Sequence, residues 1–206
     1  MLIVGLTGSI GMGKSAIAAM LRERNIPVID ADAEVHRLYA GEAVPLVEAA
    51  FPGTTHDGRI DRARLAAALG DDHARFVTLE RIIHPLVRHA ERAFLTRAHD
   101  EGAPVAVLEI PLLYETGLDA EVDAVIVASA PPDVQRARVL ARSGMSDGRL
   151  DALLTRQIPD SEKRSRADFI VDTGGTLADS EAQLDAILTR LEAWPHAAYT
   201  RFWQSD

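Results

Sequence analysis

The stretch GLTGSIGMGKS, residues 5–15, decides the fold of this chain. It contains Gly, four further residues, Gly, Lys and Ser in that order; an apolar run precedes it and a stretch with helical period follows it. A phosphate-binding loop requires this strand–turn–helix context, because glycines let backbone N–H groups face phosphate oxygens and the helix directs its positive end toward them. We therefore favour a phosphate-binding loop over the alternative, a glycine-rich turn that caps an ordinary helix.

The residues of this loop have expected roles. Lys14 is expected to reach the β- and γ-phosphates, and Ser15 is expected to offer its hydroxyl to Mg²⁺, which is held mostly by phosphates and waters. The loop predicts binding of ATP or GTP and does not identify the group that receives the phosphate. The residues expected to bind the nucleotide are Gly8, Gly11, Met12, Gly13, Lys14, Ser15 and Ala16.

Apolar runs rich in strand-forming residues alternate with helical stretches along the chain, which predicts an α/β fold of three layers with a five-stranded parallel sheet. The five runs are Leu2 to Leu6, Ile26 to Ile29, Val105 to Ile110, Val122 to Ala128 and Phe169 to Val171. At 206 residues the chain suits a single domain.

We expect three parts within this domain. They are a core of about 1–31, 99–131 and 167–195, a helical insertion of about 32–98 without a convincing strand, and a lid of about 132–166. The expected helices are 15–24, 62–69, 75–97, 132–142, 147–157 and 177–191. Pro132 is expected to open the first lid helix and Ser146 to cap the second.

The composition excludes several classes of protein. A formal net charge of −9 argues against a general binder of nucleic acid or membrane surfaces, so an anionic ligand must meet a local basic site. The absence of cysteine excludes disulfides and thiolate chemistry, and the seven histidines lack metal-ligand spacing. The apolar start is too short for a signal peptide or membrane span, so we expect a cytoplasmic protein, with no obligate protein partner evident.

Acidic residues follow two of the predicted strands, where open α/β sheets place their ligands. Of Asp30 and Asp32, one could orient or deprotonate an acceptor hydroxyl while the other orders water on Mg²⁺. The alternative is that Asp32 caps the next helix. Glu109 ends the third run, and a carboxylate near Mg²⁺ and a solvated charge at a strand end are equally supported interpretations of it.

Basic residues in the predicted lid are the second group of candidates. Arg138 and Arg142 are one helical turn apart on the same face, with Gln135 beside them. The two guanidinium groups could contact the transferring phosphoryl group and exclude water when the segment closes. The alternative is a solvated helix face. A later basic cluster, which could extend this face or only flank it, contains Arg156, Lys163, Arg164 and Arg166.

These motifs together resemble the dephospho-coenzyme A kinase family. The resemblance covers about residues 2 to 175, and it is specific because the phosphate loop occurs together with the strings HPL and PLLYE. The matching strings are GLTGSIGMGKS (5–15), VIDAD (28–32), DGRIDR (57–62), LERIIHPL (79–86), IPLLYE (110–115) and EKR (162–164), followed by Ala167-Asp168. Two loop residues depart from the family pattern, because Ser9 stands where Gly is usual and Ala16 where Thr is usual.

The resemblance implies a core like that of the nucleotide monophosphate kinases, a coenzyme A domain in the insertion and a lid on the arginine helices. The implied catalytic residues are Lys14, Asp32, Arg138 and Arg142, with Asp32 near the acceptor hydroxyl. Thr173 and Gly174 are implied to lie near the adenine of ATP. The implied substrate-binding residues are Asp32, His84, Arg88 and Leu112. For His84, a capping or core histidine at a kinked helix is an equal alternative.

The leading hypothesis is a kinase that transfers the γ-phosphoryl group of ATP to the ribose 3′-hydroxyl of dephospho-CoA, the last step of coenzyme A biosynthesis. ATP and Mg²⁺ are then the expected cofactors. A nucleoside or nucleotide kinase is the alternative within the same class. A nucleotide-gated switch is the alternative from another class, but the sequence has no Asn-Lys-x-Asp string for reading guanine.

Overall fold

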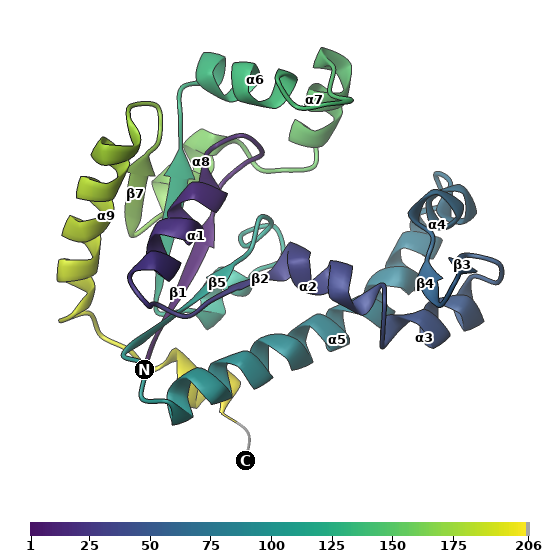
Figure 1. The fold of residues 1–206 in the computed structure, drawn as a ribbon, viewed down its shortest axis with the longest axis horizontal. Coiled ribbons are helices and arrows are strands. Elements are labelled where there is room, and N and C mark those ends of the chain that lie inside the picture. Colours follow the sequence, from purple (N-terminus) through teal and green to yellow (C-terminus); the bar gives the residue numbers. More distant parts are fainter. Residues whose placement is uncertain (205–206) are drawn as a thin grey trace. The chain divides into compact units, whose positions relative to one another are not determined.

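The computed structural model describes residues 1–204. The chain forms two compact units (Figure 1). Unit 1 contains Met1–Ile29 and the chain from Leu95 onward, and unit 2 contains Asp30–Phe94. Each unit has a hydrophobic core of its own.

A five-stranded sheet with the order β2-β5-β1-β6-β7 is the centre of unit 1. Its strands are β1 (Leu2–Thr7), β2 (Val28–Asp30), β5 (Val105–Glu109), β6 (Ala124–Ser129) and β7 (Phe169–Asp172). The pairs β1–β5, β1–β6 and β6–β7 are parallel. Each predicted apolar run forms a strand, so the predicted α/β fold with its five-stranded sheet is confirmed. The carboxyl ends of the strands carry the polar residues, as in other open sheets.

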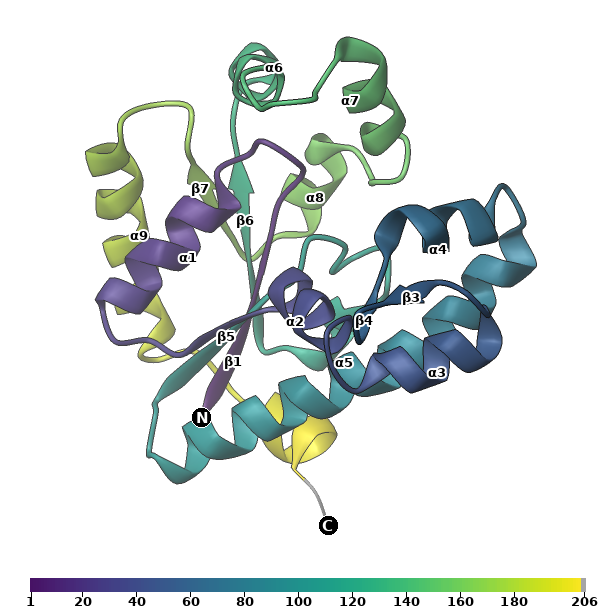
Figure 2. The same ribbon diagram turned by 45° about the vertical axis from the view of Figure 1, so that its right-hand side comes forward.

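Helices cover both faces of this sheet. Helices α1 (Lys14–Glu23) and α9 (Leu177–Leu191) lie next to each other on one face, where Ile17 and Leu184 join the core made by alternate residues of the strands (Figure 2). Helix α8 (Asp160–Arg166) packs against β6. The short helices η1 (Leu118–Glu121) and η2 (Tyr199–Trp203) meet where the indole N–H of the fully buried Trp203 donates to the carbonyl of Glu121.

The predicted lid contains α6 (Pro132–Leu140) and α7 (Asp147–Leu154) before α8. Pro132 is the first residue of α6, and the hydroxyl of Ser146 accepts the N–H of Arg149 at the start of α7, so both predicted helix starts are confirmed. Both helices end earlier than predicted. Helix α6 stops before the turn in which Gly144 has a φ of 75°, so Arg142 lies outside it.

Unit 2 is mainly helical, but it contains a hairpin that the sequence did not predict. Its elements are α2 (Ala31–Leu38), α3 (Ala43–Ala50), β3 (Thr55–His56), β4 (Arg59–Ile60), α4 (Arg62–Leu69) and the first part of α5 (His73–Asp100). Asp57 and Gly58 have φ values of 49° and 71°, as a two-residue hairpin turn requires. Strands of two residues are too short to produce an alternating pattern, which is why the expectation of a strand-free insertion was wrong.

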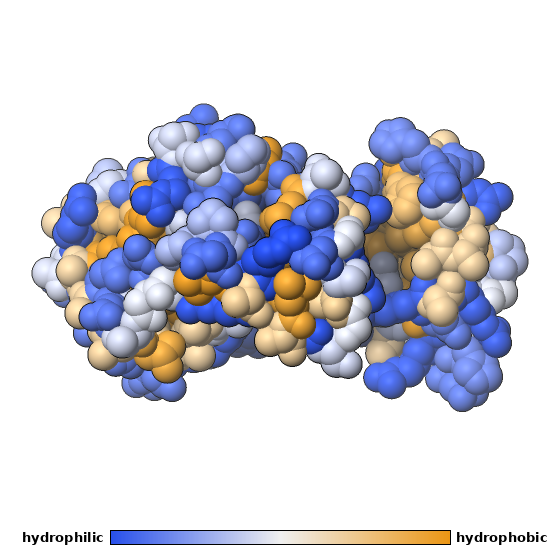
Figure 3. Space-filling model, turned by 90° about the horizontal axis from the view of Figure 1, so that it is seen from above, coloured by the Kyte–Doolittle hydropathy of each residue, from blue (hydrophilic) through white to orange (hydrophobic). Residues whose placement is uncertain are grey.

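Hydrophilic and apolar residues are interspersed on the face of the molecule that Figure 3 displays. The large apolar side chains that are exposed are Leu46, Leu112, Leu140 and Leu177. Within residues 1–204, the helices are all too short or too polar to span a lipid bilayer.

Candidate active site

The phosphate loop connects β1 to α1 and leaves the start of that helix open to an anion. Gly11 and Gly13 have φ values of 79° and 82°, which favour glycine, and a Cβ on Gly13 would lie 2.7 Å from the hydroxyl oxygen of Thr173. Gly13 is also the N-cap of α1, where no side chain caps the helix and no acidic residue lies in the first turn. The first N–H groups of α1 and its positive end therefore suit a phosphate group.

Lys14, in the first turn of α1, is paired with the carboxylate that ends β5. Its Nζ lies 2.7 Å from Oε1 of Glu109, and Arg22 contacts the other carboxylate oxygen at 3.4 Å. Residue Glu109 is only 1% exposed. It lies beside the loop because Glu109 pairs with Leu6 in the parallel register of β5 and β1. The interpretation of Glu109 as a solvated charge is therefore wrong.

Thr173, just after β7, connects three parts of the site. Its hydroxyl donates to the carbonyl of Met12 at 2.8 Å, and its N–H donates to the carbonyl of Ser129 at 2.8 Å. The guanidinium of Arg138 donates to the Thr173 carbonyl at 2.6 Å and to its hydroxyl at 3.1 Å. Arg138 is thus bound to the end of β7 in this structure, while its predicted partner Arg142 is exposed in the turn after α6. The two arginines do not share a helix, because α6 is shorter than predicted.

The other predicted residues of unit 1 lie close to the same strand ends. Met12 is buried, and its sulfur accepts the N–H of Ala130 at 3.1 Å. Gly174 lies against the start of the lid, where a Cβ would come within 2.5 Å of Pro131 Cδ. Leu112, in the loop after β5, is 38% exposed. Gly8 and Ala16 flank the loop at the end of β1 and within the first turn of α1.

A buried ion pair that sequence reasoning missed lies behind this loop. Lys163, in α8, is fully buried; its Nζ is 2.9 Å from Oε1 of Glu115 and 3.1 Å from the carbonyl of Pro111. The hydroxyl of Thr7, immediately before the phosphate loop, donates to the same carbonyl at 3.1 Å. The string EKR does not distinguish a buried lysine from its solvated neighbours, so only the resemblance to a family motif could have drawn attention to it.

Tyr114, next to Glu115, extends this buried region. Burial raises the pKa of Tyr114 to about 12, and the guanidinium of Arg166, 4.2 Å above its ring, acts in the opposite direction. The phenol is therefore neutral at physiological pH, and it serves as an apolar surface for the end of α8.

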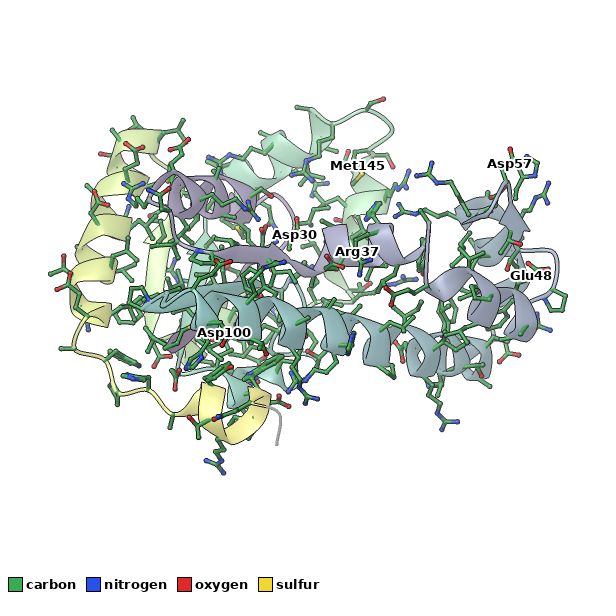
Figure 4. All side chains as sticks on the ribbon, turned by 60° about the horizontal axis from the view of Figure 1, so that its bottom comes forward. Asp30, Arg37, Glu48, Asp57, Asp100 and Met145 are labelled. Carbon is green, nitrogen blue, oxygen red and sulfur yellow. The ribbon has the colours of Figure 1, made fainter. Side chains whose placement is uncertain are left out.

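The remaining candidates belong to unit 2. Asp30, labelled at the start of α2 in Figure 4, is the N-cap of that helix: its carboxylate accepts the N–H groups of Asp32 and Ala33 at 2.9 and 3.1 Å. The capping interpretation therefore applies to Asp30, and for Asp32 it was wrong. Asp32 is exposed in the first turn of α2.

His84 and Arg88 lie one turn apart in α5, which places them on one face of that helix. His84 is exposed and Arg88 is partly buried. The helix continues through Pro85, so His84 caps no helix end, and as an exposed residue it is no core histidine. Both alternatives to a binding role for His84 are therefore wrong.

The donor set for a divalent cation is small. In the described part of the chain, residues 1–204, no three or more His, Asp or Glu side chains form a group that could hold a metal ion. Ser15, exposed in the first turn of α1, contributes one hydroxyl. This set fits Mg²⁺ that phosphate oxygens and water coordinate for the most part.

Comparisons with known proteins agree with this geometry. The sequence model of a family described as dephospho-CoA kinase matches residues 2–179. The dephospho-CoA kinase of Rhodopseudomonas palustris (strain BisB18) is 56% identical over 195 residues, which are 95% of this chain and 98% of the relative. A crystal structure of TT1252 from Thermus thermophilus superimposes with a TM-score of 0.82 at 38% identity, covering 92% of this chain and 97% of that one.

A dephospho-CoA kinase from Campylobacter jejuni gives a TM-score of 0.60 at 25% identity, covering 92% of this chain and 96% of that one. The family match spans most of the chain, and it includes the phosphate loop, Glu109 and the buried Lys163. This chain belongs to the dephospho-CoA kinase family.

Proposed function

We propose that unit 1 binds ATP with Mg²⁺ and that Asp32 of unit 2 orients the 3′-hydroxyl of dephospho-CoA for attack on the γ-phosphorus. The observation that carries the nucleotide part is the uncapped start of α1 next to the Lys14–Glu109 pair. An uncapped helix start, a lysine and a serine hydroxyl together match the needs of a triphosphate. The acceptor follows from membership of the family, since a phosphate loop alone does not select one.

Lys14 has a double role in this proposal. An ammonium has three donors, and the ion pair with Glu109 uses one of them, so two remain for phosphate oxygens. Glu109 keeps the lysine next to the loop before the nucleotide arrives, which lowers the entropy lost on binding. Ser15 would hold Mg²⁺ through its hydroxyl, and the bound ion would offset charge on the phosphates.

The transfer itself depends on positioning and charge. Asp32 accepts a hydrogen bond from the 3′-hydroxyl and takes up its proton as the new O–P bond forms and the bond from the γ-phosphorus to the bridging oxygen breaks, which releases ADP. Arg142 is exposed in the turn after α6, where its side chain could reach the phosphoryl oxygens. Arg138 donates two hydrogen bonds to Thr173, and the remaining donors of its guanidinium could reach the phosphoryl oxygens if the lid moves toward them.

A substrate panel tests this proposal. The protein is supplied with ATP and Mg²⁺ and with dephospho-CoA, adenosine, uridine or a nucleoside monophosphate, and ADP formation is followed by a coupled assay. We expect turnover with dephospho-CoA to exceed turnover with each of the others by at least about a hundredfold in kcat/KM, as expected when a site is built for the whole substrate. A comparable rate with a nucleoside or nucleotide would identify the alternative kinase, and chelation of Mg²⁺ should abolish every rate.

A further inference from the structure

The middle of the phosphate loop is held by two glutamine side chains. The side-chain carbonyl of Gln157 accepts the N–H of Ile10 at 3.2 Å, and the side-chain amide of Gln135 donates to the carbonyl of Ile10 at 2.8 Å. The polarity of both bonds is fixed by the backbone, because an N–H needs an acceptor and a C=O needs a donor. Ile10 thus has both of its peptide groups bound by side chains from far along the sequence.

The two glutamines lie on either side of the part of the lid that carries Arg138 and Arg142. Gln135 is a buried residue of α6, before the lid turn, and Gln157 lies between α7 and α8, after it. The 21 residues between them, 136–156, include Arg138 and Arg142. This part of the lid is therefore connected to the phosphate loop on both sides, through a single residue of the loop.

The Gln157 end is fixed by the buried ion pair. The N–H of Ile158 donates to Oε1 of Glu115 at 2.9 Å, and the same oxygen is paired with Lys163. Lys163 in turn shares the Pro111 carbonyl with Thr7 at the base of the loop. The Gln135 end packs closely against the phosphate loop: a Cβ on Gly11 would lie 3.0 Å from the backbone carbonyl oxygen of Gln135.

We infer that Gln135 and Gln157 are positioning residues for phosphoryl transfer: through Ile10 they make the arrangement of the lid and that of the phosphate loop depend on each other. This inference rests on the proposed function. A lid that carries the arginines and a loop that holds the γ-phosphate must be in register when the reaction occurs. The N–H and the C=O of one residue, Ile10, set that register without contact to the substrate.

The test applies one substitution at two positions. Gln135→Glu and Gln157→Glu add the same charge with the same shape, but only the second keeps its hydrogen bond, because a carboxylate accepts an N–H and cannot donate to a C=O. We expect Gln135→Glu to lower kcat/KM for dephospho-CoA by about tenfold or more, and Gln157→Glu to stay within about threefold of the parent. Gln157→Met, which loses the acceptor, should fall with Gln135→Glu.

A pH profile separates positioning from a loss of structure. Glu has an ordinary pKa of about 4.3, and burial at position 135 raises it, so lowering the pH from 8 to about 5.5 begins to protonate the introduced carboxyl and restores a donor. We expect the rate of Gln135→Glu relative to the parent to rise over this range, while the relative rate of Gln157→Met stays constant. Melting temperatures of all variants are measured in parallel.

Equal losses in the two glutamate variants would show that added charge explains the effect, and would overturn the inference. Unchanged rates in both Gln135→Glu and Gln157→Met would overturn it as well. If the parent protein binds ATP in calorimetry but does not phosphorylate dephospho-CoA, the proposed function fails. The inference is then tested by the ATP affinity of the same variants: Gln157→Glu must bind ATP more tightly than Gln135→Glu.

Discussion

The phosphate-binding end of unit 1 and the candidate acceptor residues of unit 2 differ in how their charges are satisfied. In unit 1, Lys14 is bound to a buried carboxylate and Arg138 to a backbone carbonyl. In unit 2, Asp32 and His84 are exposed. We expect the positions of Lys14 and Arg138 to be set by the protein before a triphosphate binds. The exposed candidate acceptor residues of unit 2 would instead be ordered by the substrate.

The largest expected effect comes from Lys14, which the Glu109 carboxylate holds beside the phosphate loop of unit 1. Lys14→Ala should lower kcat/KM by on the order of a thousandfold or more, because it removes charge aimed at the transferring phosphate. Among residues 1–204, the same change leaves Arg22, at 3.4 Å, as the cation paired with the buried Glu109, so it should also lower the melting temperature. Steady-state kinetics and thermal unfolding measure the two effects.

The double variant Lys14→Ala with Glu109→Gln separates them. Replacing the carboxylate by an amide of the same shape removes the unpaired charge, so stability should recover while activity should not. Recovery of both would mean that Lys14 acts only by stabilising the loop. It would contradict the view that unit 1 holds Lys14 in place to contact the phosphate.

Asp32 tests the other half of the comparison. Asp32→Asn should lower kcat by on the order of a hundredfold and leave ATP binding unchanged, because an amide cannot take up the hydroxyl proton. Asp30→Asn is the matched control two residues away: Asn caps a helix about as well as Asp, so activity and stability should both stay near the parent. Isothermal calorimetry with ATP and single-turnover kinetics with dephospho-CoA provide the measurements. Turnover within about twofold of the parent in Asp32→Asn would remove Asp32 from the mechanism.

The difference between Asp30 and Asp32 also indicates what a sequence can predict. Both follow the predicted apolar run 26–29, and the choice of cap depends on whether α2 begins at Ala31 or two residues later. Helix ends are set by a few local hydrogen bonds, and sequence periodicity does not resolve them. The same uncertainty placed Arg142 inside α6, where Arg138 would have been its neighbour.

Local motifs, and the sheet that alternating strands and helices imply, were predictable, whereas single side-chain contacts that depend on strand register were not. The phosphate loop and the helix from Leu177 to Leu191 were found because glycine spacing and helical period are local signals. The pairing of Lys14 with Glu109 depends on the register of β5 against β1. The contacts of Ile10 with Gln135 and Gln157 join residues 125 and 147 positions apart, and no pattern in the loop sequence indicates them.

A smaller effect is expected for the lid arginine that the protein leaves exposed. Arg142→Lys and Arg142→Ala should both lower kcat by about tenfold, because a guanidinium can donate two parallel hydrogen bonds to phosphoryl oxygens and an ammonium cannot. The KM for dephospho-CoA should change less than kcat, since the contact forms in the transition state. Rates near the parent in the lysine variant would exclude a bidentate contact, and unchanged rates in both would make Arg142 a solvated residue.

The smallest effect should come from helix caps, which serve structure alone in both units. In unit 2 the Asp61 carboxylate accepts the N–H groups of Arg64 and Ala63, and these bonds hold its pKa below the ordinary value of 3.8. Because the pKa is lower in the folded state, the ionised cap stabilises the fold fully above the unfolded value, and this stability is lost as pH falls through the lowered pKa. In unit 1 Asp179 behaves alike, because the hydroxyl of Thr176 donates to its carboxylate and lowers its pKa.

Asn caps about as well as Asp at neutral pH and does not titrate. Asp61→Asn should therefore leave kcat and the melting temperature at pH 7 almost unchanged and reduce the drop in melting temperature between pH 7 and about pH 3. A loss of kcat in Asp61→Asn at pH 7, with the melting temperature unchanged, would show that this cap takes part in the reaction, and the distinction between structural and chemical carboxylates in unit 2 would fail.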